Sequence, residues 1–215
     1  RDYTVMLELL QKLEDQFNDK SLRDAILQSA MQVEKDREHW LEEGLDAQKV
    51  IPRMVAGLRE NREQLLHFSF GPSARRNLQR SLRKVYRRGW KGLHRSLKHP
   101  TGEHFHEWRK RVKYLYFHFQ LLHEIWPPLM KTWEEELSTL QSDLGDYHDQ
   151  DVLRAFLQSG RHNLQENQKN MVIHHLQSIQ ENMRPALYAL GRRLYTESPP
   201  DFAARITSYY DTWRS

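Results

Sequence analysis

The 215-residue sequence contains no cysteine. It therefore has no disulfide framework and no thiolate chemistry, and a reducing, cytoplasmic setting is the expectation. It also lacks an apolar run of membrane-spanning length and the pattern of a secretory signal peptide. A chain of this length without those features is expected to be a soluble protein that can bury a sizeable core.

Strand signals and the common phosphate-handling motifs are absent as well. No alternating apolar and polar run is bounded by hairpin turns. The sequence has no Gly-rich P-loop, no alternating Glu-x-Glu-x-Lys strand and no zinc-protease helix with two histidines. Because we also find no pair of a nucleophile and a base, we expect a binding module with no catalytic residue, cofactor or metal site.

Apolar residues at helical spacing run along the whole chain, and short connections imply antiparallel neighbours in an all-α protein. Glycine, proline and capping signals set the expected boundaries. A break is expected at Gly145. Pro185 is expected to kink its helix, and Pro52 is tolerable only as a kink or at a late first turn. The predicted helices cover residues 2–16, 21–44, 45–68, 73–98, 103–125, 129–143, 146–158, 164–195 and 202–213.

Positive charge is concentrated in one part of the chain. Residues 71–113 contain fourteen Lys or Arg and two Glu, a net charge of +12, so the rest of the chain carries −8 against a total of +4. Like charges at helical spacing repel one another unless an anion lies across them. The cations expected opposite the apolar stripes of helices 73–98 and 103–125 are Arg76, Arg80, Arg83, Arg87, His106, Arg109, Lys110 and Lys113.

Two motifs follow one another at a characteristic spacing. The first is His106-x-x-Arg109-Lys110-x-x-Lys113, which comes after the Arg-rich helix, and the second is Gly145-Asp146-Tyr147-His148-Asp149-x-Asp151-Val152-Leu153. Together they resemble the CHAD family, the conserved-histidine α-helical domains. The resemblance is close over residues 73–157 and loose over residues 1–68.

This resemblance implies a pseudo-twofold arrangement of four-helix units whose basic surface binds inorganic polyphosphate, in some members at polyphosphate granules. We expect His148 to line the anion site, and Asp146 or Asp149 to orient a neighbouring cation. The chain departs from the family where an Arg-Tyr pair is replaced by Tyr116-Phe117, which removes one expected cation. The histidine motif of the first half is also absent.

A weak internal repeat bears on the domain organisation. A basic residue, Asp and Val recur with the same spacing in residues 1–5 and 148–152. If these are copies, the chain begins inside the first of two helical units, and an upstream half or a second chain would complete the binding surface. We therefore predict residues 1–70 as the remainder of the first helical half and residues 71–215 as the second half, which together form one domain.

Polyphosphate suits such a surface because it offers one negative charge per phosphate and no base to stack on or to read. Arginine forks and lysine point charges are sufficient to bind it, and binding should weaken with salt. One alternative is that the same surface binds the backbone of RNA or DNA without reading sequence. A second, less favoured alternative makes His148 and Asp149 part of a phosphohydrolase site, although no further metal ligands are spaced for it. Tyr86 and Trp90 are expected to pack in the core rather than to cover phosphates.

Overall fold

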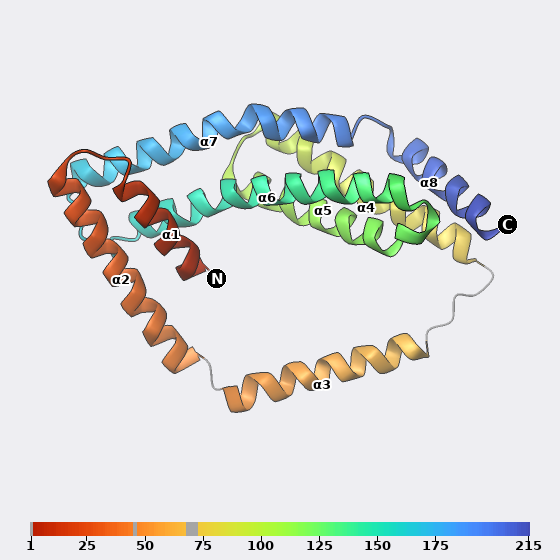
Figure 1. Cartoon of the computed structure of the whole chain (residues 1–215), viewed down its shortest axis with the longest axis horizontal. Helices are drawn as coiled ribbons and strands as arrows, with labels where there is room; N and C mark the ends of the chain where they lie inside the picture. The colour runs from red at the N-terminus through yellow and green to blue at the C-terminus, as the bar shows by residue number, and fades with distance from the viewer. Residues whose placement is uncertain (1, 45–46, 68–72) are drawn as a thin grey trace. The chain divides into compact units, whose positions relative to one another are not determined.

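The computed structural model describes residues 2–44, 47–67 and 73–215. These residues form eight α-helices and one short 3-10 helix, with no strand among them (Figure 1). The all-α class expected from the sequence is confirmed. The helices are α1 (Asp2–Glu14), α2 (Lys20–Gly44), α3 (Ala47–Leu66), α4 (Ala74–Lys98), α5 (Gly102–Leu121), η1 (His123–Ile125), α6 (Pro127–Gln158), α7 (Glu166–Leu194) and α8 (Pro199–Arg214).

One predicted boundary was wrong. The sequence placed a helix break at Gly145, but α6 continues through it without interruption. Gly145 is buried, and a Cβ at this position would lie only 3.3 Å from the Arg109 side chain of α5. Glycine inside a helix costs about 1 kcal/mol relative to alanine, so its presence here reflects packing against α5 rather than the end of a helix.

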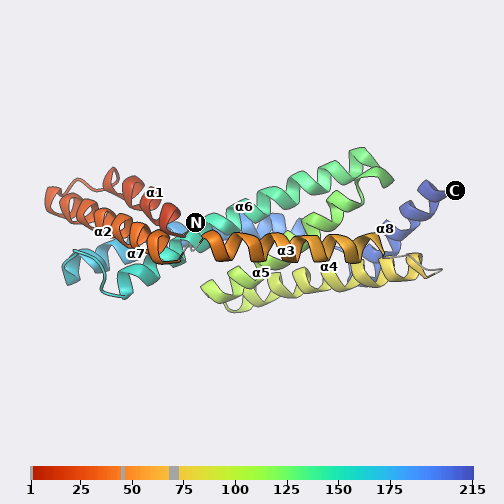
Figure 2. The same ribbon diagram turned by 90° about the horizontal axis from the view of Figure 1, so that it is seen from below.

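The described residues group into two compact units. Unit 1 takes its residues from 1–71 and 152–173, so it includes a segment that the sequence prediction had assigned to the second half. In this unit α1 packs along α2, as Figures 1 and 2 both show. The buried side chains between these two helices are Met6, Leu10, Leu13, Leu22, Ala25, Ile26 and Val33.

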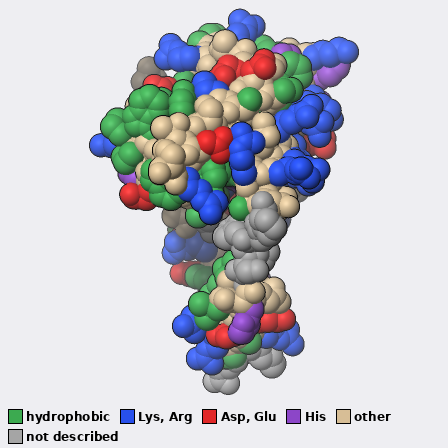
Figure 3. All heavy atoms as spheres, turned by 90° about the vertical axis from the view of Figure 1, so that its right-hand side faces the viewer, with side chains coloured by type: hydrophobic (Ala, Val, Ile, Leu, Met, Phe, Trp, Pro, Cys, Tyr) green, Lys and Arg blue, Asp and Glu red, His purple; other side chains and the backbone are tan. Residues whose placement is uncertain are grey.

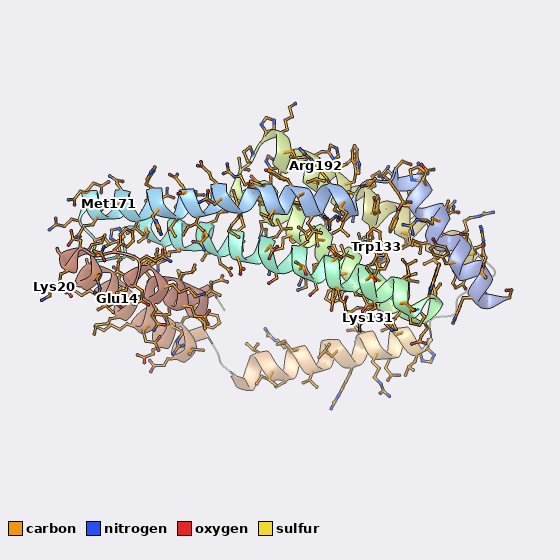
Figure 4. All side chains as sticks on the ribbon, turned by 45° about the horizontal axis from the view of Figure 1, so that its top comes forward. Glu14, Lys20, Lys131, Trp133, Met171 and Arg192 are labelled. Atoms are coloured by element: carbon orange, nitrogen blue, oxygen red, sulfur yellow. The ribbon has the colours of Figure 1, made fainter. Side chains whose placement is uncertain are left out.

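Unit 2 takes residues 72–151 and 174–215, and it contains the first sequence motif and the second one as far as Asp151. Its helix α4 packs along α5 and along α8. The interior is aromatic: the Phe119 ring stacks on Trp133 with centroids 4.8 Å apart, and the Tyr86 ring stacks on Phe202 at 3.9 Å. Trp133 is labelled in Figure 4 near Lys131, whose side chain is exposed.

The apolar stripes expected for α4 and α5 face this interior. Trp108 and Phe119 of α5 are fully buried, as is Tyr86 of α4, which confirms that Tyr86 is a core residue. Trp90 is partly buried and packs against the same core. Because the apolar stripe of each helix is fixed against the core, the cations on its other sides are held at defined positions around the helix.

Candidate anion-binding site

Helix α5 carries four of the nine predicted site residues, and its own core residues set its rotation. Trp108, Val112 and Leu115 point into the interior of unit 2 and have no exposed surface. At about 100° per residue, Arg109 then lies roughly 90° and His106 roughly 150° around the helix from the centre of this buried stripe. Both side chains are nevertheless half-buried, because they pack against α6.

The side of α5 that carries these residues packs against α6, and the two helices run antiparallel. A Cβ on Gly102 would lie 2.2 Å from Asp151 Oδ2, and a Cβ on Gly145 would lie 3.3 Å from both Nε and Nη2 of Arg109. Between these two contacts, the rings of His106 and His148 lie with their centroids 4.4 Å apart. Residue numbers therefore increase along α5 as they decrease along α6, as expected for antiparallel helices.

We call the group formed by His106, Arg109, Gly145 and His148 the α5–α6 seam. It brings together three of the predicted site residues from two different helices. Three of its nitrogens, Nδ1 of each histidine and Nε of Arg109, are buried and have no hydrogen-bond partner among the described residues. Buried polar atoms in folded proteins are nearly always paired, so these nitrogens are suited to meet the oxygens of an anion.

The charge around the seam is positive enough to affect the titration of His106. Burial is the largest cause that lowers the pKa of His106. The positive charges of His148 and Lys110 lower this pKa further, and Glu107 partly offsets them. Without an anion present, the neutral imidazole is therefore favoured at His106.

Lys110 and Lys113 differ in their surroundings. Lys110 is half-exposed and pairs with Glu107, which also accepts a hydrogen bond from Arg111 Nη2 at 3.1 Å. These two cations hold the pKa of Glu107 below its usual value. Lys113 is exposed and has no acidic partner among the described residues; its Nζ lies 5.8 Å from the centroid of the Phe117 ring.

A carboxylate that was not singled out from the sequence anchors this region. Asp151 lies against Gly102 at the beginning of α5, and its Oδ1 accepts a hydrogen bond from Gln180 Nε2 at 2.9 Å. A carboxylate at the N-terminus of a helix is favoured by the helix dipole. Gly145 and Asp151 both belong to the second motif, so the sequence already contained a pattern that marks them. Their contacts with α5 become visible only in the packing of the helices. A cation-orienting role for Asp146 or Asp149 stays a prediction.

The four predicted arginines of α4 lie on a different side of the unit. Helix α4 meets α5 through Ser81, whose Oγ is 3.3 Å from His118 Nε2, and through Gly92, which packs against Trp108. At 100° per residue, the arginines lie roughly 140° around α4 from this line of contact. The structure therefore does not bring them to the α5–α6 seam. These exposed arginines, which we call the α4 face, are Arg76, Arg80, Arg83 and Arg87.

The α4 face is strongly basic. Helix α4 contains ten Lys or Arg and no acidic residue. In the described part of the chain, Arg75 alone among these ten forms an ion pair, with Asp211 at 2.7 Å. Figure 3 shows Lys and Arg side chains on several parts of the visible surface, with Asp and Glu side chains among them. The cations of α4 are thus left to face solvent or an anionic ligand.

Comparison with known proteins identifies the family of this chain. A family model described as CHAD domain matches residues 1–158, a range that contains the α4 face and the α5–α6 seam. The chain belongs to the CHAD domain family. No curated protein and no solved structure matches it. Among the helices of the described residues, none combines the length and apolar character needed to span a membrane.

Proposed function

We propose that this protein binds inorganic polyphosphate, with the α5–α6 seam at the centre of the site. The observation that carries this proposal is the convergence of His106, Arg109 and His148, each with a buried nitrogen that no described residue pairs. Phosphate oxygens accept hydrogen bonds from imidazolium and guanidinium groups, and charge-assisted hydrogen bonds of this kind are the stronger ones. Family membership at the level of the CHAD domain supports the same ligand class.

The exposed cations extend the surface for a long polyanion. Lys113 lies one helical turn beyond Arg109 on α5, and Lys110 nearby forms an ion pair with Glu107. The α4 face adds a second row of cations on the same unit. Polyphosphate presents a charge at every phosphate and no base, so a surface that offers it cations suits it. Binding should be driven largely by the release of counterions, as for nucleic acids.

Competition measurements test the choice of ligand. Polyphosphate and a mixed-sequence oligonucleotide, compared at equal phosphate concentration, should compete unequally, with polyphosphate displacing the oligonucleotide. The double variant Arg109→Ala with Lys110→Ala should bind polyphosphate more weakly and keep its helical circular dichroism, because neither side chain belongs to the apolar stripe. A preference for the oligonucleotide would favour a nucleic-acid function instead.

We propose binding without turnover. In the phosphohydrolase alternative, His148 and Asp149 would act with further metal ligands. No group of three His, Cys, Asp or Glu side chains in the described part of the chain is arranged to hold a metal ion. A phosphate-release assay on the purified protein, with His148→Ala as the comparison, decides the question. Turnover that this variant abolishes would establish the enzyme.

We further propose that binding directs the protein to polyphosphate granules in the cytoplasm, where it acts as a targeting or scaffolding module. Fluorescence microscopy of a tagged chain tests the location. The tagged protein should coincide with stained granules, and the variant lacking the cations of Arg109 and Lys110 should spread away from them.

A further inference from the structure

The two imidazoles of the α5–α6 seam form a close pair from different helices. Their planes make an angle of 41°, and Nδ1 of each ring is buried without a hydrogen-bond partner among the described residues. A neutral imidazole donates from one nitrogen and accepts at the other, whereas the protonated ring donates from both. Phosphate oxygens are acceptors, so the protonated form of the His106–His148 pair matches them better.

Charged groups lie on the three helices that pack in this region. Arg109 packs on α6 beside it, and Arg184 of α7 donates to the Tyr147 hydroxyl through Nη2 at 3.3 Å. Glu107 is a carboxylate that raises the pKa of His106, and it is already paired with Lys110 and Arg111. The titratable and charged groups around the pair are, from α5, Glu107, Arg109 and Lys110; from α6, Asp146, Asp149 and Asp151; and from α7, Arg184.

We infer that the α5–α6 seam binds its polyphosphate together with a proton, which the His106–His148 pair takes up from solvent. This inference rests on the proposed function and adds its regulation by pH. A bound polyanion places negative charge beside the imidazoles and offers oxygen atoms that accept hydrogen bonds from their N–H groups. Both effects favour the protonated imidazole. Because binding and protonation are linked, acidification must strengthen binding by the same coupling.

The direction of the pH effect follows from comparing the pKa of the pair in the ligand-free protein with its pKa in the complex. The ligand raises the pKa of the pair above its value in the ligand-free protein, where burial and neighbouring cations lower the pKa of His106. Affinity is then highest below the ligand-free pKa and declines as the pH rises through the pKa of the complex. With an ordinary histidine pKa of about 6.5, the change falls between about pH 6 and pH 8. Uptake of one proton changes the dissociation constant by at most about tenfold per pH unit.

Calorimetry measures the proton directly. Long-chain polyphosphate is titrated into the whole protein at pH 7 in two buffers that differ in ionisation enthalpy, and the difference in heat gives the number of protons taken up. We expect about 0.3 to 0.6 proton per site at pH 7, and binding about three- to tenfold tighter at pH 6 than at pH 8. Long chains keep the contribution of the titrating terminal phosphates small.

Histidine variants assign the proton. The double variant His106→Gln with His148→Gln should bind more weakly, through Arg109 and Lys113, and should take up no proton. His174→Gln, an exposed histidine of α7, is the matched control and should behave as the original chain does. If the double variant does not fold, each single variant should still lose part of the proton uptake.

The outcomes separate the two proposals. Polyphosphate binding with no proton uptake, or with uptake that survives in the double variant, would overturn the coupling and leave polyphosphate binding intact. Absence of binding at every pH between about 6 and 8, the range in which histidine titrates, would overturn both the coupling and the proposed function.

Discussion

The guanidinium of Arg109 lies directly against Gly145 of α6, so close that a Cβ at position 145 would lie 3.3 Å from its Nε. Alanine at this position has to push Arg109 aside by a few tenths of an ångström. The Gly145→Ala protein should therefore bind polyphosphate several-fold more weakly. Its stability should stay equal or rise by up to about 1 kcal/mol, because alanine is the better helix former. Calorimetry and urea unfolding measure the two effects.

Gly57→Ala is the control for this prediction. A Cβ at Gly57 of α3 would meet no atom within 4 Å, so the change offers the same gain in helix propensity without touching Arg109. It should leave polyphosphate affinity unchanged. If Gly145→Ala bound as tightly as Gly57→Ala, the contact with Arg109 would have no part in binding.

Removing one negative charge should strengthen binding. Glu107 pairs with Lys110 and Arg111 on the exposed side of α5. In Glu107→Gln, both cations are available to phosphate, and we expect affinity to rise about two- to fivefold at low salt, in line with the modest energy of exposed ion pairs. The gain should shrink as salt is added. Weaker binding in this variant would mean that Glu107 holds the two cations in their binding positions.

The α4 face is expected to contribute through charge rather than through a precise fit. Arg80, Arg83 and Arg87, changed together to Gln, should reduce the salt dependence of polyphosphate binding by about two to three counterions, by analogy with nucleic acids. The control is the same change at the exposed residues Arg53, Arg59 and Arg62 of α3. An equal loss in both variants would indicate a general charge effect.

Two buried tyrosines should respond oppositely to loss of their hydroxyl groups. Tyr86 donates from its hydroxyl to Leu194 O at 3.0 Å, so Tyr86→Phe should lower the free energy of unfolding by about 1–2 kcal/mol. The Tyr195 hydroxyl is buried and has no hydrogen-bond partner among the described residues. Tyr195→Phe should therefore leave stability unchanged or raise it by about 1 kcal/mol. Thermal and urea unfolding of both variants check the difference, and a marked loss in Tyr195→Phe would contradict it.

The helices and the rotation of α5 could be predicted from the sequence because both depend on local apolar spacing. Trp108, Val112, Leu115 and Phe119 lie on one side of a 3.6-residue period, and the structure buries all four. The same spacing placed His106 and Arg109 away from the centre of the core. The family was also recognisable, because its motifs are short and lie close together in the chain.

The rest depends on contacts between helices, which local spacing does not determine. Gly145 was interpreted as a helix break by its usual behaviour, whereas in the folded unit it provides room for Arg109 of another helix. The arginines of α4 were expected to join those of α5 on one surface. Helix α4 contacts α5 through Ser81 and Gly92, so the arginines lie on a side of α4 that does not face α5.

The most direct test of the account is calorimetry of the chain with long-chain polyphosphate at two salt concentrations, with a mixed-sequence oligonucleotide as competitor. We predict binding that weakens steeply with salt, that the oligonucleotide does not displace at equal phosphate concentration, and that is reduced in the variant combining Arg109→Ala and Lys110→Ala. Displacement by the oligonucleotide, or an absence of binding at both salt concentrations, would contradict the account.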